Sequence, residues 1–219
     1  MSRKTCHLLI IALLILQISA SSRPASRRAP LPSEAAVHYR VDARRSQLIV
    51  RAFVGGLLSP FGHNHTIAAR DLSGDVQIAD PESLRGASLT IVVRAASLTV
   101  IDKVSESDRR QIEQTMRTEV LETSKYPEIV FHSTEVQAQK VGDGQYRIRI
   151  AGDLSLHGVT RPLVINALAS FDGETLHARG EFTLRQSDYK ITPPSLGLGT
   201  IRVKDELKLS FDITATRAG

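Results

Sequence analysis

The feature that most constrains the fold is an alternation of apolar and polar residues with a period of two, which recurs along the chain from Val37 onward. Successive side chains of a strand point to opposite faces of a sheet, so this pattern predicts strands with one buried and one solvated face. The segments that carry it are 37–42, 46–54, 66–79, 86–95, 128–140, 144–157, 160–172, 174–187 and 205–216.

Short turns separate several of these segments. Gly142-Asp143-Gly144, His157-Gly158 and Asp172-Gly173 each lie between two strand patterns, and such residues favour hairpin turns. Consecutive strands should therefore pair antiparallel, and the four segments from residue 128 to residue 187 should form a meander.

One segment, 105–124, interrupts the alternation and predicts a helix. Charged residues are dense there, and Ser105 followed three residues later by Asp108 is typical of a helix start. Ile112, Met116 and Val120 recur every four residues, which is the spacing of one helix face.

Antiparallel strands with one polar face each must bury the other face, and a sandwich and a closed barrel both do so. Several of the strands are twelve or more residues long, and long meandering strands favour a tilted barrel. We expect an all-β fold, an antiparallel up-and-down barrel of eight or nine strands with one inserted α-helix at about 105–124.

The residues expected inside this barrel are mainly small and aliphatic, which predicts an apolar cavity suited to a lipid tail. A filled barrel that acts as a surface interaction module would share the same strand signals and is the alternative. The lumenal ligand-binding residues that we predict are Val50, Val76, Ile78, Leu89, Ile91, Val93, Phe131, Ile148, Ile150, Leu154, Ile165, Phe182, Leu184, Leu209 and Phe211.

The N-terminus has the pattern of a secretory signal peptide. Arg3 and Lys4 precede an apolar run, Leu8–Leu16, and Ile18-Ser19-Ala20 offers a cleavage site. A retained anchor is the alternative, but the run is too short to span a bilayer. We expect a cleaved signal peptide over 1–20, a flexible linker over 21–36, a barrel domain over 37–219, no stable membrane insertion, and a periplasmic or secreted location.

Charge and motifs exclude several function classes. The net charge of +5 arises from basic residues before Val37, so the barrel domain is nearly neutral and offers no basic groove for nucleic acid. No nucleophile elbow, P-loop, zinc-protease motif or dinucleotide fingerprint occurs, and the only cysteine, Cys6, lies in the predicted signal peptide. We therefore expect no enzymatic activity and no cofactor.

His63 and His65 lie two residues apart, so on an extended segment both rings leave the same face. Three interpretations are open. The rings could hydrogen-bond the backbone of a loop, contact a lipid head group at the barrel mouth, or share a metal ion with a carboxylate such as Asp71. Two imidazoles fall short of the usual three or four ligands, so we predict no metal site.

Three segments carry a family resemblance. Val120–Phe131, Gly152–Pro162, and Asp188–Pro193 with Val203–Glu206 resemble the helix-to-strand segment, the central hairpin and the last loop of the YceI-like family of polyisoprenoid-binding proteins. The similarity covers residues 41–214, and Ser59–Thr66 resembles a subgroup with a His-x-His loop. Lys190 departs from the family, which usually has glycine there.

The resemblance implies a lipocalin-like antiparallel barrel in the periplasm or outside the cell, which binds and does not catalyse. Its lumen would hold an isoprenoid or other long-chain lipid, such as a polyprenyl phosphate or a quinone tail. The alternative function is a non-enzymatic metal- or stress-related interaction module that uses the His63/His65 loop. The oligomeric state is open, with a homodimer as one candidate.

Overall fold

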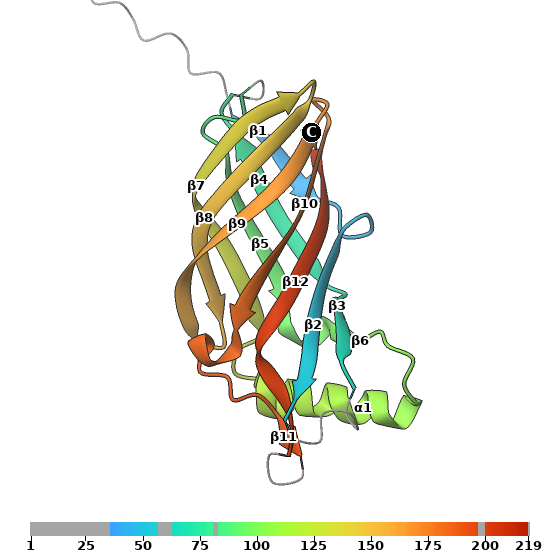
Figure 1. The fold of residues 1–219 in the computed structure, drawn as a ribbon. Coiled ribbons are helices and arrows are strands. Elements are labelled where there is room, and N and C mark those ends of the chain that lie inside the picture. The colour runs from blue at the N-terminus through green and yellow to red at the C-terminus, as the bar shows by residue number, and fades with distance from the viewer. Residues whose placement is uncertain (1–35, 57–62, 81–82, 197–199, 219) are drawn as a thin grey trace, which may run out of the picture. The chain divides into compact units, whose positions relative to one another are not determined.

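Antiparallel strands close into a barrel in the computed structural model of the chain, which describes residues 36–56, 63–80, 83–196 and 200–218 (Figure 1). The predicted signal peptide, 1–20, and all of the predicted linker except Ala36 lie outside the described residues. So do residues 57–62, which include the first four residues of the predicted His-x-His loop, Ser59–Thr66. The two histidines themselves are described.

The barrel has eight strands, and the first pairs with the last. Tyr39 lies opposite Arg217 and Val41 opposite Ala215, which closes the ring. The all-β class and the up-and-down barrel expected from the alternation are confirmed. In order around the ring, the strands are β1 (Val37–Val41), β4 (Leu72–Ile78), β5 (Ser88–Arg94), β7 (Glu128–Gly142), β8 (Gln145–Leu156), β9 (Val159–Phe171), β10 (Thr175–Arg185) and β12 (Ile201–Arg217).

The predicted meander is the run β7 to β10, whose neighbours pair in sequence order. Its turns have the backbone that their residues favour. His157 and Gly158 both adopt positive φ, at 52° and 73°, and Gly144 adopts 61°. Two successive residues with positive φ form a turn whose twist matches that of the flanking strands, so the long β8–β9 hairpin continues without a break.

Three of the barrel positions are occupied by strands in two parts. The lower parts, as drawn in Figure 1, are β2 (Gln47–Gly55), β3 (His65–Ala69) and β6 (Leu98–Val100). In space, β2 continues β1, β3 continues β4 and β6 continues β5. At this end of the sheet β2 pairs with β12, β3 pairs with β2, and β6 pairs with β3. The nine predicted segments thus give eight barrel positions, because 37–42 and 46–54 are two parts of one position.

The predicted bounds of two strands are wrong. The segment 66–79 is broken at Arg70 and Asp71, whose amides donate to the carbonyl and hydroxyl of Ser97 at 3.2 and 3.0 Å. Ser97 ends a 3-10 turn, η2 (Ala95–Ser97), that leads into the unpredicted strand β6. The last strand also begins earlier than predicted, at Ile201, and pairs there with the short β11 (Ser195–Leu196).

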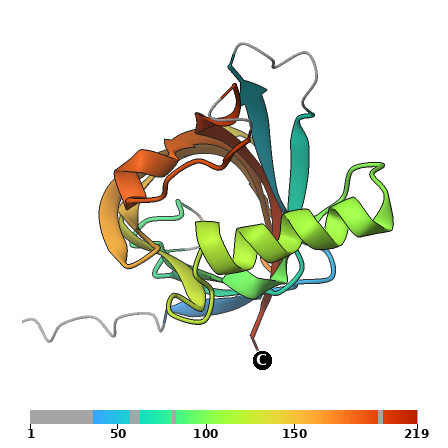
Figure 2. The same ribbon diagram turned by 90° about the horizontal axis from the view of Figure 1, so that it is seen from below.

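The predicted helix is present as α1 (Glu106–Thr115), and a π-helical turn, η3 (Met116–Val120), continues it. Ser105 caps its first turn, because the Ser105 hydroxyl accepts the amide of Asp108 at 3.1 Å. The Glu113 carboxylate accepts the amide of Val100 at 3.1 Å and so joins the helix to β6. Figure 2 shows α1 lying across one end of the barrel, which we call the helix end.

The opposite end, which we call the closed end, carries the β7–β8 turn and the β4–β5 loop. Tyr39 and Tyr146 belong to the core there, the half-buried Phe171 packs against it, and Tyr39 is only 1% exposed. The Tyr39 hydroxyl donates to the carbonyl of Gly173 at 2.9 Å, and its ring meets Phe171 edge-on at 5.7 Å between centroids. This end of the barrel is therefore solid.

Candidate functional site

The barrel encloses a cavity of about 670 Å³, lined almost wholly by apolar side chains of the barrel strands. The structure places all of the predicted lumenal residues on its wall. Their role in binding a ligand stays a prediction. They are Val50, Val76, Ile78, Leu89, Ile91, Val93, Phe131, Ile148, Ile150, Leu154, Ile165, Phe182, Leu184, Leu209 and Phe211.

The lumen is hollow rather than filled, as the exposure of its inward-facing side chains indicates. Leu89, Ile91, Phe182, Leu184 and Phe211 all line the cavity, yet each is only half-buried. A side chain inside a packed core would be fully enclosed by its neighbours. These residues instead present apolar surface to an open interior, which a ligand of matching chemistry would cover.

Two glycines make room for aromatic rings on the lumen wall. A Cβ at Gly152 would lie 2.6 Å from the Phe131 ring, and one at Gly180 would lie 2.7 Å from the Phe211 ring. The two rings therefore lie close against bare backbone of the neighbouring strand while they line the cavity. Phe182 and Phe211 sit 6.4 Å apart between centroids.

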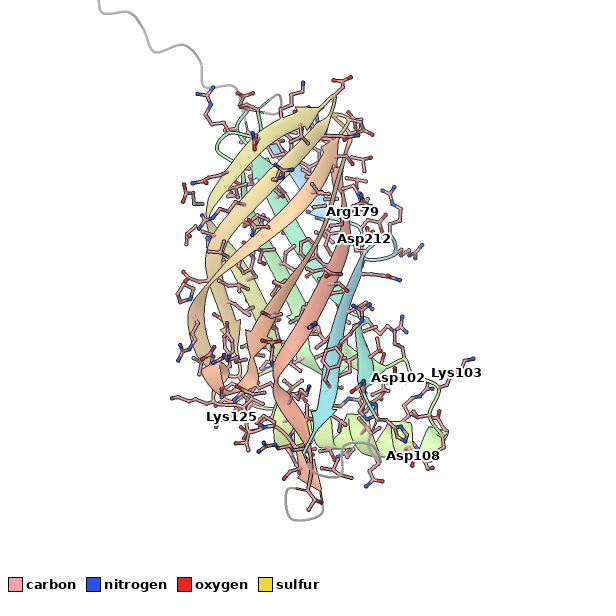
Figure 3. All side chains as sticks on the ribbon, in the orientation of Figure 1. Asp102, Lys103, Asp108, Lys125, Arg179 and Asp212 are labelled. Atoms are coloured by element: carbon pink, nitrogen blue, oxygen red, sulfur yellow. The ribbon has the colours of Figure 1, made fainter. Side chains whose placement is uncertain are left out.

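The cavity opens at the helix end. His63, Asp108, Gln111 and Arg202 line the cavity and are also exposed to solvent. The other polar lining residues, which include His65 and Gln186, lie toward the same end. Figure 3 shows Asp102 and Asp108 beside α1, far from Arg179 and Asp212 higher on the barrel. The site thus combines an apolar lumen with a polar mouth.

His65 is held at this mouth by a carboxylate that the sequence did not indicate. Its Nδ1 lies 3.2 Å from Oδ2 of Asp102, and the same oxygen accepts the amide of Thr66 at 2.8 Å. Asp102, and not Asp71, is therefore the carboxylate partner of His65. Asp102 follows β6 outside any alternating pattern, so only the pairing of β3 with β6 brings it to His65.

The part of the chain that the structure describes contains no group of three or more His, Cys, Asp or Glu side chains arranged to hold a metal ion. Among the same residues, no helix is both long enough and apolar enough to cross a membrane.

His157 lies outside the lumen and ties the helix end together. Its Nε2 lies 2.8 Å from Oε2 of Glu122 and its Nδ1 lies 3.2 Å from the carbonyl oxygen of Tyr189. The Tyr126 ring covers it at 4.6 Å. Ser155, two residues earlier in β8, shares a hydrogen bond with the hydroxyl of Thr160 at 2.7 Å.

A pair of hydrogen bonds joins the turn η4 (Gln186–Tyr189) to β12. The carboxylate of Asp205 accepts the amide of Ser187 at 2.7 Å and its hydroxyl at 2.6 Å. These two hydrogen bonds lower the pKa of Asp205 from the ordinary aspartate value. Lys190 ends η4 in the left-handed conformation, with φ 57°, which is the backbone that the glycine usual at this position would favour.

A sequence model of the YceI-like domain matches residues 39–215. Curated relatives named UPF0312 protein match shorter stretches. The one from Pseudomonas savastanoi is 35% identical over 42% of this chain and 47% of its own length. The one from Shewanella baltica is 29% identical over 68% of this chain and 71% of its own length. The chain thus spans about half the length of the first of these relatives.

Solved structures share the fold. Burkholderia cenocepacia BcnA superposes with a TM-score of 0.60 at 19% identity, over 80% of this chain and 99% of its own. A polyisoprenoid binding domain from Saccharophagus degradans superposes with a TM-score of 0.59 at 14% identity, over 83% and 99%.

Proposed function

Because the match over residues 39–215 makes this chain a member of the YceI-like family, we propose that it is a non-enzymatic binding protein for an isoprenoid-type lipid. The lipid is a polyprenyl phosphate or a molecule with a quinone tail, and its chain lies in the barrel lumen. The similarity of the fold to a polyisoprenoid binding domain supports the choice of ligand.

The observation that carries the proposal is the hollow apolar lumen. A cavity of about 670 Å³ lies within the range of small-molecule sites, and its wall consists almost entirely of aliphatic and aromatic side chains. Water in such a space makes few hydrogen bonds with the wall, so an apolar chain that displaces it is favoured. A barrel acting only as a surface module would have no need of this space.

The tail can supply the affinity without a specific polar group. Removing about ten methylene equivalents from water contributes about 8 kcal/mol, which corresponds to a micromolar dissociation constant before the costs of ordering are subtracted. A prenyl chain longer than this gains more. Affinity then depends mainly on the length of chain that the lumen can enclose.

The head group of the lipid lies at the helix end in this proposal. Arg202 and His63 are exposed there, and His65 is oriented by Asp102. An arginine suits phosphate oxygens, and imidazole can donate to a phosphate or to a quinone carbonyl. A homodimer stays a prediction, as does the periplasmic or secreted location.

The test is to purify the protein under native conditions, extract it with organic solvent and identify the extract by mass spectrometry. We expect a long-chain isoprenoid in near-stoichiometric amount. As a control, protein that has been unfolded, washed and refolded is offered a polyprenyl phosphate and, separately, inorganic phosphate. Empty extracts together with failure of the refolded protein to retain the polyprenyl phosphate would overturn the proposal.

A further inference from the structure

The loop between β4 and β5 contains a single large apolar side chain in a polar sequence, Asp80-Pro81-Glu82-Ser83-Leu84-Arg85-Gly86. Loops of this composition usually turn their side chains to solvent. Leu84 does not, because it is only 3% exposed and lines the lumenal cavity together with Ile78 and Ala87.

The backbone of Leu84 adopts a strained conformation, and this strain indicates that the position of the side chain matters. Its φ is 53°, in the left-handed region that residues with a Cβ avoid. Glycine or asparagine would adopt the same conformation with less strain. A leucine here is therefore explained by its side chain, since nothing in the turn itself calls for one.

Hydrogen bonds hold the residues on either side of Leu84. The amide of Asp80 donates to the carbonyl of Arg85 at 3.1 Å, and the Ser83 hydroxyl donates to the Asp80 carboxylate at 2.6 Å. The two residues next to Leu84 are thus tied to the end of β4. Leu84 is held with its side chain against the barrel interior.

Leu84 also marks where the cavity stops. Tyr39 and Tyr146 belong to the core at the closed end and Phe171 packs against it, but none of the three lines the cavity. The last lining residues before these rings include Leu84, Ile78, Ala169 and Leu176. Ile78, Ala169 and Leu176 are fixed within barrel strands, whereas Leu84 enters from a loop.

From this geometry we propose that Leu84 is the stop that sets the longest lipid tail the lumen accepts. The inference rests on the proposed function, since it concerns the depth of the same lumen. Leu84 is a specificity-determining residue in this proposal. Lipids whose chains reach it are fully enclosed, and longer chains must leave carbons in water at the helix end.

The test is a ladder of all-trans prenols that differ by one isoprene unit, bound to the purified protein and measured by native mass spectrometry. An engineered apolar cavity of about 150 Å³ accepts benzene, which has about the bulk of one isoprene unit. Leu84→Ala and Leu84→Gly should therefore extend the length limit by about one unit. The first prenol beyond the wild-type limit should gain more than tenfold in affinity, because each enclosed methylene contributes about fourfold and two of the five carbons of an isoprene unit already supply about sixteenfold.

Leu84→Gly also relieves the strained backbone, so an equal shift in both variants assigns the effect to side-chain volume. Leu84→Phe should shorten the length limit, and this variant tests the proposal if Leu84→Ala and Leu84→Gly fold poorly. Leu98→Ala is the matched control. Leu98 is similarly buried and lines the cavity, but it lies on β6 toward the helix end. Its truncation should leave the limit unchanged.

The outcomes separate the two proposals. If the wild-type protein retains no prenol of any length, the proposed function fails. If it retains prenols but the length limit is the same in folded Leu84→Ala, Leu84→Gly and Leu84→Phe, then Leu84 is only a core residue and the inference is overturned. A shift of the limit in Leu98→Ala as large as that in Leu84→Ala would overturn it as well.

Discussion

The closed end and the helix end of the barrel are built from the same long strands but are packed in different ways. At the closed end, Tyr39, Tyr146 and Phe171 fill the space between the strands. At the helix end the strands separate, α1 lies across the gap, and polar residues such as Arg202 border the cavity. One end therefore buries aromatic rings in a packed core, and the other provides access to the lumen.

The largest effect on stability should come from Tyr39→Ala. It removes a ring that is fully enclosed and hydrogen-bonded to Gly173, and we expect a loss of about 3–5 kcal/mol in the free energy of unfolding. Phe182→Ala, whose ring borders the hollow lumen, should cost only about 1–2 kcal/mol. Urea unfolding measures both. Equal losses would show that the two regions are packed alike.

Binding should show the next largest effect, in Ile91→Asp. A carboxylate on the lumen wall can stay hydrated in the empty protein, but it must lose water when a lipid tail enters, so affinity should fall about a hundredfold. The control is Val92→Asp, the next residue of the same strand, which faces outward. Retention of a prenol by folded Ile91→Asp at wild-type affinity would show that the lumen is not the binding site.

A smaller effect should follow from loosening the helix. Ser105→Ala removes the cap of α1 and should cost about 1 kcal/mol of local helix stability. Hydrogen exchange of the amides of 106–115 should quicken about fivefold, and bound lipid should leave faster, while the closed end exchanges as before. Ser105→Asp supplies another good cap and should restore both rates. Quickened exchange with an unchanged lipid release rate would exclude α1 as part of the exit path.

The smallest effect concerns pH. The pKa of Asp205 is lower in the folded chain than in the unfolded chain, so its stabilising contribution is fully present above the ordinary aspartate value near 4 and is lost as pH falls through the folded value. Asp205→Asn should therefore lower the free energy of unfolding at pH 7 by at most about 1 kcal/mol, and this deficit should shrink as pH falls through the lowered pKa of Asp205. Melting temperatures of both proteins over a series of pH values measure it, and a deficit that stays constant as the pH falls would point to a different cause.

Period-two alternation together with the length of the strands predicted the fold, because most barrel strands place apolar residues inside and mainly polar residues outside; Val164 and Leu168 of β9 are exposed exceptions. Tyr146, Ile148 and Ile150 are buried, while Arg147 and Arg149 between them are exposed. The same periodicity placed the predicted lumenal residues on one wall. The helix was predictable because Ser105 and the four-residue spacing of Ile112 and Met116 are local signals.

The rest depends on contacts that no local pattern records. Asp102 reaches His65 only because a strand of three residues, β6, pairs with β3. Leu84 is a lone apolar residue in a turn, so it has no periodicity from which burial could be inferred. The barrel opens at the end where the two-part strands diverge. The break between β3 and β4 is fixed by hydrogen bonds from the amides of Arg70 and Asp71 to Ser97, a contact distant in sequence.

The pairing of Tyr39 with Arg217 has a consequence for the order of folding. The β7–β10 hairpins join neighbours along the chain and can form early, whereas the ring is sealed only when segments about 180 residues apart in sequence meet. No enclosed lumen exists before that seam forms. A lipid present during folding would therefore encounter an open curved sheet first, and its capture should be slowed by whatever delays the meeting of the two terminal strands.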